Sequence, residues 1–176
     1  IFPAFSLAKY LISTNSTAIR IIKNSNIKYG MIITDVQKRG RGQYGKKWIS
    51  YKGNLFVSFF FKFDNFSVSL KQITKINCLL VKKLLSNYYK KEIIFKKPND
   101  LMINKKKICG ILQEKISKLN NRYLIVGIGV NVMKSPNLKN YPTTNLFELL
   151  NKKISKKRIE KEIKKIFETK LTKLLK

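Results

Sequence analysis

The sequence predicts an α+β domain in which helices cover a mixed, largely antiparallel sheet, and three observations support this class. Apolar and aromatic runs of strand length recur along the chain, whereas two longer stretches place their apolar residues at helical spacing. Short polar turns separate several of the strand candidates, as in hairpins. Helices and strands are also interspersed, a mixed order typical of an α+β architecture. The 176 residues suffice for a full core, and we expect residues 1–176 to form one domain.

Four helices are expected, each from a local signal. Hydroxyl and amide side chains in residues 13–17 can cap a helix over residues 18–23. Ser69 is expected to cap a helix that ends near Tyr89. A short helix is expected at residues 144–150 and a long one at 155–175. The apolar stripes of the two long helices are Leu70, Ile73, Ile76, Leu80 and Leu84, and Ile159, Ile163, Ile166, Phe167, Leu171 and Leu174.

The strands are expected from β-branched and aromatic runs and from the polar turns between them. Residues 104–106 form a polar stretch between two such runs, which predicts a hairpin. Asn120 and Asn121 supply the next turn. The expected strands are residues 31–36, 54–63, 92–96, 101–103, 107–115 and 122–132.

A formal net charge of +29, from 38 Lys and Arg against 9 Asp and Glu, is the strongest compositional signal. Such charge serves nucleic-acid binding or the steering of an acidic partner. A dedicated nucleic-acid binder concentrates its charge on one face or arm, whereas these lysines are spread through helices, turns and strands alike. The distribution therefore favours compositional bias over a specific nucleic-acid partner.

Several function classes are excluded by what the sequence lacks. There is no histidine, which removes Ser-His and Cys-His nucleophiles and most zinc sites. Cys78 and Cys109 have no metal-ligand spacing and are expected to be reduced, buried residues of a cytoplasmic protein. No apolar run reaches the ~18 residues that span a bilayer, so no membrane association is expected. The first residues show no basic segment and no cleavage site, so no signal peptide is expected.

Residues 40–45, Gly-Arg-Gly-Gln-Tyr-Gly, hold three of the 8 glycines of the chain. Glycines let main-chain N–H groups approach a ligand closely, and consecutive N–H groups form a concave anion site. Arg39, Arg41, Lys46 and Lys47 add positive charge around it. The loop therefore suits a phosphate or carboxylate, although a basic hairpin turn without a ligand explains the same residues.

Two further clusters combine charged residues with backbone constraints. Pro98 fixes the chain after a strand, and Asn99 and Asp100 present short polar groups beyond it, where a carboxylate can hold magnesium on a nucleotide. A tight Pro-Asn-Asp turn is the alternative. Lys107 starts a strand and Gly110 follows three residues later; a glycine within a strand often marks the approach of a ligand. Lys107 would point into that space, and a solvated lysine is the alternative.

A fourth cluster is the strand run 126–132, Val-Gly-Ile-Gly-Val-Asn-Val. Gly127 and Gly129 lie on the same face of this strand, where they leave room for something flat against the sheet. Asn131 follows them near the end of the run.

In this order the clusters resemble the motifs of the biotin–protein ligase family. Residues 37–48, with the tryptophan that ends them, resemble its biotin and adenylate loop, and residues 53–58 resemble the strand that follows. Residues 96–101, Lys-Lys-Pro-Asn-Asp-Leu, resemble Lys-Trp-Pro-Asn-Asp-Leu. Three further motifs are matched by Ser-Thr-Asn at 13–15 and by residues 107–112 and 127–131. The match covers about residues 11–133 and implies the class II synthetase-like fold of biotin and lipoate ligase catalytic domains.

The resemblance implies an ATP-dependent ligase without a tightly bound cofactor. The carboxylate of biotin attacks the α-phosphate of ATP, which gives biotinyl-adenylate and pyrophosphate. A lysine of a biotin carboxyl-carrier acceptor protein then displaces AMP. Bringing two anions together requires fixed cations and N–H donors rather than a nucleophile, which suits these residues.

The resemblance also implies the role of each site residue. Lys107 and Arg41 are the implied catalytic residues, with Lys107 bridging the carboxylate and the α-phosphate, and Asp100 lies near Mg²⁺. The implied biotin contacts are Ser13, Thr14, Asn15, Gln37, Arg41, Gly42, Gln43, Lys107 and Gly110. The implied nucleotide contacts are Gly40, Lys47, Trp48, Asn99, Asp100 and Asn131.

Three departures from the family pattern bear on activity. Lys97 stands where Trp is usual, which removes or replaces a packing contact at the nucleotide. Gln43 stands where a basic residue is frequent, which weakens the electrostatic capture of anions. We also expect neither an N-terminal helix-turn-helix module nor the small C-terminal β domain that is common in the family.

Three alternatives stay open at this point: a lipoate or octanoate–protein ligase of the related fold, a basic nucleic-acid-binding protein, and an inactive protein that only binds biotin. The spacing of residues 40–45 and the Pro-Asn-Asp cluster favour biotin over lipoate, and no nucleic-acid-binding motif is present. An exposed strand edge in this type of fold would allow a homodimer.

Overall fold

A seven-stranded sheet forms the centre of the molecule, with its strands in the order β1-β2-β5-β9-β8-β7-β6. The computed structural model describes residues 4–63 and 69–174. β1 and β2 are parallel, and the other neighbours are antiparallel, so the fold is the mixed, largely antiparallel α+β class that the sequence predicts. The strands are β1 (Ala4–Leu11), β2 (Tyr29–Gln37), β5 (Leu55–Lys62), β6 (Ile94–Lys96), β7 (Asp100–Ile103), β8 (Lys106–Lys118) and β9 (Asn121–Val130).

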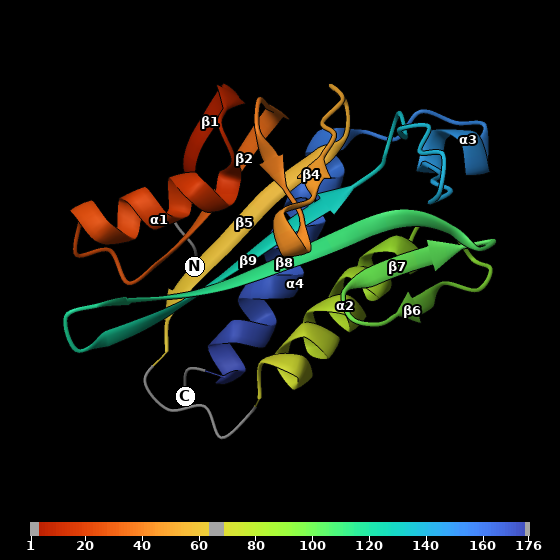
Figure 1. The fold of residues 1–176 in the computed structure, drawn as a ribbon. Helices are drawn as coiled ribbons and strands as arrows, with labels where there is room; N and C mark the ends of the chain where they lie inside the picture. The colour runs from red at the N-terminus through yellow and green to blue at the C-terminus, as the bar shows by residue number, and fades with distance from the viewer. Residues whose placement is uncertain (1–3, 64–68, 175–176) are drawn as a thin grey trace.

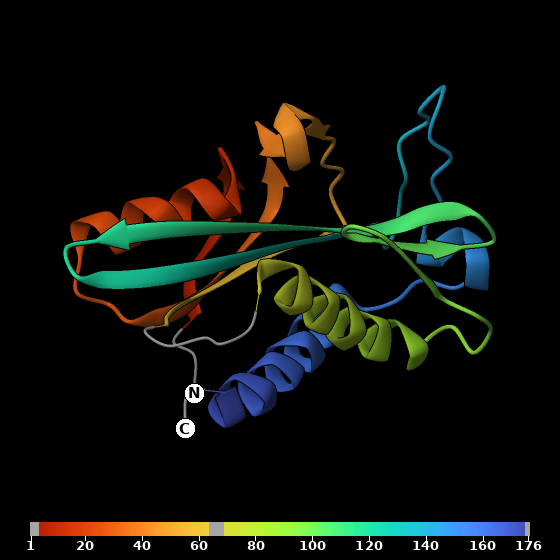
Figure 2. The ribbon, with the colours of Figure 1, turned by 60° about the horizontal axis from the view of Figure 1, so that its bottom comes forward.

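Helices cover both faces of this sheet (Figure 1). In Figure 2, α1 and the small β3–β4 hairpin lie above the sheet, and α2 and α4 lie below it. None of the helices in residues 4–63 and 69–174 is both long and apolar enough to cross a bilayer. The remaining elements are α1 (Thr14–Asn24), β3 (Gly40–Arg41), the 3-10 turn η1 (Gln43–Gly45), β4 (Lys47–Trp48), α2 (Leu70–Ser86), α3 (Leu146–Leu150) and α4 (Lys156–Leu174).

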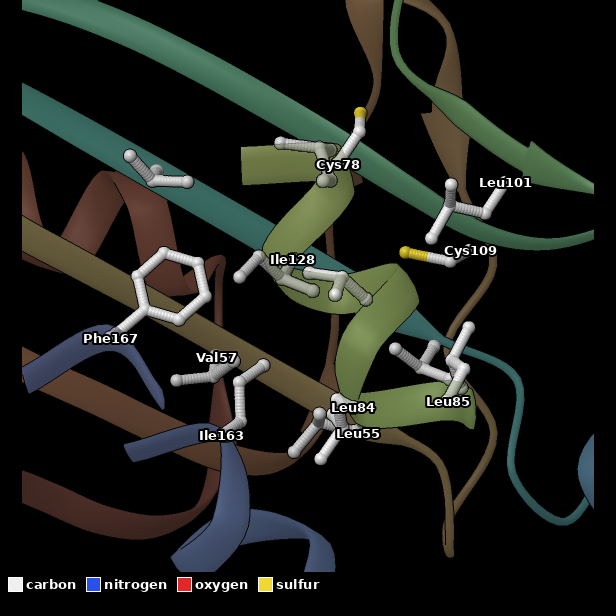
Figure 3. Packing of buried hydrophobic residues seen from close by; sticks show 14 of the residues in the cluster. Leu55, Val57, Cys78, Leu84, Leu85, Leu101, Cys109, Ile128, Ile163 and Phe167 are labelled. Carbon is white, nitrogen blue, oxygen red and sulfur yellow. The ribbon is translucent and has the colours of Figure 1, made fainter. Parts of the chain in front are cut away.

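The larger hydrophobic core lies between the sheet and the helices α2 and α4 (Figure 3). There the ring of Phe59 in β5 stacks on Phe167 of α4, with ring centroids 4.3 Å apart. Phe60 belongs to a smaller cluster on the opposite face, together with Ala18 and Ile22 of α1. Because β5 is buried on both faces, its sequence is mostly apolar rather than alternating, with Ser58 as a buried polar residue in its middle.

Both thiols lie in the larger core, where Figure 3 shows them on different elements, Cys78 on α2 and Cys109 on β8. Burial raises the pKa of Cys78 from 9.0 to about 12, and it raises the pKa of Cys109 well above 9.0. Thiols that stay protonated are poor nucleophiles and poor metal ligands. The prediction that both cysteines are buried is confirmed.

The predicted helices are present, although some of their ends differ from expectation. α1 begins at Thr14 rather than at residue 18, because Ser13 is the N-cap and its hydroxyl accepts a hydrogen bond from the N–H of Ser16. Ser69 caps α2 as predicted, in a capping box with Gln72. α2 ends at Ser86, three residues before the predicted Tyr89.

The apolar stripe predicted for α2 was partly wrong. Leu70 is 41% exposed, whereas Asn77 and Cys78, which the stripe omitted, are buried. The buried face also carries the apolar Val81 and Leu85, which the predicted stripe omitted, so the stripe was placed off the face that packs on the core. In α4 the predicted Ile159, Ile163 and Phe167 are buried. The side chains of Leu171 and Leu174, and the whole of Leu175, lie outside the described residues.

Each predicted strand is confirmed with shifted ends, whereas β1, β3 and β4 are not among the predicted strands. The β7–β8 turn places Asn104 and Lys105 at positive φ, as a tight hairpin requires. β1 is an edge strand, and Tyr10 near its end is 54% exposed.

Candidate active site

Residues from all of the predicted clusters line one cavity of about 530 Å³. Its walls come from the start of α1, the end of β2, the β3–β4 hairpin, residues 96–100, β8, β9 and residues 136–143. Of the predicted site residues, which all lie in the described part of the chain, Gly40 alone does not line it. The lining includes Ser13, Thr14, Asn15, Gln37, Arg41, Gly42, Gln43, Lys47, Trp48, Asn99, Asp100, Lys107, Gly110 and Asn131.

Trp48 lies flat over two glycines that face each other across the β8–β9 pair. Gly110 is the register partner of Gly129. A Cβ on Gly129 would come within 2.5 Å of Trp48 Cε2, and one on Gly110 within 2.7 Å of Trp48 Cζ3. The glycine pattern predicts room for a ligand, but in this structure the flat group that the glycines accommodate is the indole. Trp48 lines the cavity, and its predicted contact with the nucleotide stays a prediction.

Asn15 is fixed over the third glycine of this sheet region. A Cβ on Gly127 would overlap the Asn15 amide, so only glycine permits this approach. Ser58 Oγ donates to Asn15 Oδ1 at 2.5 Å. Asn15 Nδ2 donates to Glu114 Oε2 at 2.7 Å and to the Leu112 carbonyl at 3.2 Å. These partners determine which way the amide points.

Thr14 and Gln37 join the start of α1 to the end of β2. Gln37 Oε1 accepts from the Thr14 N–H at 2.9 Å and from Thr14 Oγ1 at 3.2 Å. Thr14 is buried, as is Ser13, which precedes it in the chain. The four residues predicted to recognise the biotin ring system (Ser13, Thr14, Asn15 and Gln37) therefore form one connected polar wall of the cavity.

The glycine-rich loop is a hairpin in which β3 pairs with β4. Gly45 has φ +73°, which explains one glycine by backbone conformation. The Gly42 N–H donates to the Lys46 carbonyl at 2.6 Å, and the Lys46 N–H donates to the Gln43 carbonyl at 3.1 Å. These two N–H groups are therefore used within the hairpin, and the expected concave anion site is not formed by them. The Arg41 side chain carries the positive charge into the cavity and pairs with Glu114 at 2.8 Å.

A β-bulge sets the direction of Lys107. Along the β7–β8 pair, Leu101 faces Cys109 and Met102 faces Lys107, which leaves Ile108 as an extra residue. In a regular strand, residues three apart point to opposite faces, and the bulge reverses this. Lys107 and Gly110 therefore share the cavity face, and Lys107 Nζ lies 3.2 Å from the position of a Cβ on Gly110. The prediction that Lys107 points toward Gly110 is confirmed.

Asp100 holds the ammonium group of Lys107. Lys107 Nζ lies 2.8 Å from Asp100 Oδ1, and Tyr141 Oη donates to Asp100 Oδ2 at 2.7 Å. Oδ2 therefore accepts a hydrogen bond, whereas Oδ1 is in an ion pair with Lys107 without a hydrogen bond, and a metal ion would have to compete with both groups. No three carboxylate, thiol or imidazole groups cluster to hold a metal within residues 4–63 and 69–174.

Asn99 lies in the turn between β6 and β7, and Asn131 directly follows β9. Asn99 Nδ2 donates to the Ile111 carbonyl at 2.6 Å. Asn131 is 2% exposed, its Nδ2 donates to the Thr144 carbonyl at 3.2 Å, and its Oδ1 has no hydrogen-bond partner. Trp48 Nε1 is likewise buried without a partner. A buried polar atom without a partner is costly, so both atoms are suited to a ligand that supplies the missing hydrogen bond.

Positive charge dominates the cavity. Asp100 is the one carboxylate among its lining residues, all of which the structure describes. A cavity lined mainly by one sign of charge raises the local concentration of oppositely charged ligands. The cationic lining residues are Arg41, Lys46, Lys47, Lys96, Lys97 and Lys107.

Three residues with contacts to the site are not among those predicted from the sequence. Glu114 lies four residues after Gly110, on the same strand face, and the period of two could have found it. Ser58 is the register partner of Gly127 in the β5–β9 pair, so the two residues lie on the same face of the sheet. Tyr141 lies in a segment without regular structure, and no local pattern marks it.

Comparison with known proteins gives one consistent result. Residues 8–131 match the biotin/lipoate A/B protein ligase family. The chain is 32% identical over 129 residues to the bifunctional ligase/repressor BirA of Bacillus subtilis, a match over 72% of this chain and 40% of that protein. The chain thus spans about two fifths of the length of that relative.

Solved structures show the same likeness. A biotin protein ligase from Aquifex aeolicus, in complex with biotin and ATP, is 31% identical with a TM-score of 0.76, covering 94% of this chain and 68% of that one. The biotin protein ligase from Leishmania major in complex with biotin has a TM-score of 0.78 at 21% identity, covering 94% and 71%, and shows the shared fold.

Proposed function

Since the chain belongs to the biotin/lipoate A/B protein ligase family, we propose that it activates biotin with ATP and transfers the biotinyl group to a lysine of an acceptor protein. The observation that carries this proposal is the placement of Lys107 and Arg41, from different elements, in one cationic cavity beside a connected polar wall. Such a cavity suits two anionic substrates that must be brought together.

The first step joins biotin to AMP. A carboxylate oxygen of biotin attacks the α-phosphorus of ATP, and the bond to the bridging oxygen breaks, which releases pyrophosphate. Lys107 leaves Asp100 to contact the carboxylate and the α-phosphate, and Arg41 leaves Glu114 to neutralise the same charge. Fixed cations that meet charge where it develops stabilise the transition state without the reorganisation that water would require.

The polar wall orients biotin for this attack. Ser13, Thr14, Asn15 and Gln37 face the ureido ring, whose N–H and C=O groups need amide and hydroxyl partners. Gly42 and Gln43 of the hairpin cover the biotin carboxylate. Gly110 has no side chain, so the sheet beneath the carboxylate leaves room for it. Because Asn15 and Gln37 are already held by protein partners, little orientational freedom is lost on binding.

The nucleotide lies against Trp48 and Asn131. The unpartnered Trp48 Nε1 and Asn131 Oδ1 supply one donor and one acceptor for it. Lys47, Lys96 and Asn99 border the phosphate side, whereas Gly40 does not line the cavity. ATP enters as its magnesium complex; Asp100 as a magnesium ligand stays a prediction, since that role requires it to release Lys107.

In the second step the amine of an acceptor lysine attacks the acyl carbon of the mixed anhydride. The carbon–oxygen bond to AMP breaks, and the amine proton passes to solvent. The acceptor is a domain of the biotin carboxyl-carrier type, and the exposed hairpin around Tyr44, which is 91% exposed, borders the opening through which it would approach.

The test is direct. The protein is incubated with ATP, magnesium and labelled biotin, with and without a biotin-acceptor domain, and both adenylate and labelled acceptor are followed. Labelled acceptor supports the proposal. Transfer of lipoate or octanoate in place of biotin would assign the other branch of the family. Adenylate without transfer would limit the chain to the first step, and a shift with nucleic acid at physiological salt would favour the nucleic-acid alternative.

Compartment and assembly form part of the same proposal. The free, buried thiols are suited to a reducing compartment, which supports the cytoplasm. β1 lies at the edge of the sheet, where a second copy of the chain could add its own strand to form a homodimer.

A further inference from the structure

Tyr141 contacts the carboxylate that holds Lys107, although no motif of the sequence includes it. We propose that Tyr141 is a positioning residue for adenylate formation: its hydroxyl keeps Asp100 in the orientation that aims Lys107 into the cavity. This inference rests on the proposed function and deepens it by adding a residue that acts through another.

The side-chain contacts form a short chain. Tyr141 Oη donates to Asp100 Oδ2 at 2.7 Å, and Asp100 Oδ1 lies 2.8 Å from Lys107 Nζ. The Asp100 residue is 8% exposed, so these two partners rather than water determine its orientation. Because Tyr141 Oη contacts Asp100 Oδ2, Asp100 Oδ1 is the oxygen that remains for the ammonium group of Lys107.

The main chain fixes Tyr141 relative to Lys107 as well. The Lys107 N–H donates to the Pro142 carbonyl at 2.8 Å, and the Thr144 N–H donates to the Lys107 carbonyl at 3.0 Å. Both main-chain groups of Lys107 are thus bonded to the segment that carries Tyr141. A residue held in this way keeps its distance to Lys107 even when the lysine side chain moves.

The Tyr141 ring lies beside two lysines, while its hydroxyl donates to the carboxylate of Asp100. The Tyr141 ring faces Lys96 Nζ at 4.4 Å and Lys107 Nζ at 5.5 Å. When Lys107 moves to the substrate anions, Asp100 keeps the hydroxyl as a partner and remains in place to receive the lysine again.

The test begins with Tyr141→Phe, which removes only the hydroxyl, and Tyr10→Phe on the exposed edge strand is the matched control. We expect kcat for adenylate formation to fall about tenfold, equivalent to about 1.4 kcal/mol, with the KM values for biotin and ATP little changed. A raised KM for ATP with unchanged kcat would overturn the proposal, because it would place Tyr141 on the nucleotide. An unchanged kcat would overturn it as well.

A double-mutant cycle separates positioning from general support. If Tyr141 acts through Asp100, Tyr141→Phe should have no further effect on kcat in the Asp100→Asn background. Equal losses in both backgrounds would show that the hydroxyl acts by another route.

A chemical readout keeps this test independent of the ligase reaction. Acylation of lysines by acetic anhydride, followed by mass spectrometry, reports how firmly each ammonium group is held. Tyr141→Phe should raise the labelling of Lys107 several-fold and leave Lys105 at the β7–β8 turn unchanged. Unchanged labelling of Lys107 would overturn the inference. Absence of adenylation by the unsubstituted protein would instead count against the proposed function alone.

Discussion

Arg41 and Glu114 form an ion pair at 2.8 Å that joins the glycine-rich hairpin to β8. The same carboxylate oxygen accepts a hydrogen bond from Asn15 Nδ2 at 2.7 Å. The Arg41 side chain is 42% exposed, so the pair contributes no more than about 1 kcal/mol to stability. Its importance lies in geometry, because one carboxylate orients both a cation of the hairpin and an amide of the polar wall.

Glu114→Ala should therefore weaken biotin binding by roughly tenfold, the effect of losing about one hydrogen bond to a charged group. The Asn15 amide would keep only the Leu112 carbonyl as acceptor and could rotate away. Glu114→Gln retains an acceptor for Asn15 and should lose less affinity. Isothermal titration with biotin gives both values, and Glu148→Ala on α3 is the exposed control. Equal affinity of Glu114→Ala and the unsubstituted protein would contradict this role.

Lys107→Ala should reduce adenylate formation by about 10²–10³-fold, the range found when one charge-stabilising donor is removed. Arg41→Ala should also reduce it severely. Both side chains end in the cavity rather than in the core, so thermal unfolding should change little. Lys105→Ala, at an exposed turn of the same hairpin, is the control. Pyrophosphate release at a near-normal rate in Lys107→Ala would remove this lysine from the mechanism.

The sequence predicted the position of Lys107 better than its surroundings. The glycine three residues after it and the strand that it begins are local features, and local features can be recognised in one sequence. The bulge at Ile108 is different, because it depends on how β7 pairs with β8. The same holds for Tyr141, which reaches Asp100 through a segment without a periodic pattern. Residues brought together only by tertiary pairing leave no local signal.

The glycines show a second limit of sequence reasoning. The pattern at Gly127 and Gly129 correctly predicted space for a flat group on the sheet, yet it could not say which group. The structure gives the space over Gly129 to Trp48 and the space over Gly127 to Asn15, both from distant parts of the chain. The pattern therefore revealed a close approach, whereas the identity of the approaching group depended on the fold.

Trp48 is the one tryptophan of the chain, so its fluorescence reports directly on the cavity. Gly129→Ala would place a methyl group within 2.5 Å of the indole, which must then move. We expect a shifted emission maximum and weaker binding of biotinyl-adenylate. Gly45→Ala is the control: its Cβ meets nothing within 4 Å, so it should cost about 1 kcal/mol through its positive φ without changing the emission. Identical spectra for Gly129→Ala and the unsubstituted protein would show that Trp48 does not rest on this glycine in solution.

The buried thiols predict how stability depends on pH. Burial raises the pKa of Cys78 from 9.0 to about 12, so between these values the unfolded chain loses a proton that the folded chain keeps. The stabilising contribution is complete below about pH 9 and falls as the pH rises, by about 1.4 kcal/mol per unit for a thiol that is ionised only when unfolded. Lysines also titrate in this range, and Cys78→Ala separates the two effects because it changes the thiol alone. In urea unfolding at pH 8 to 11, the unfolding free energy of the unsubstituted protein should fall as the pH rises, relative to that of Cys78→Ala. A difference that stays constant over this range would mean that Cys78 ionises as readily in the folded protein as in the unfolded chain.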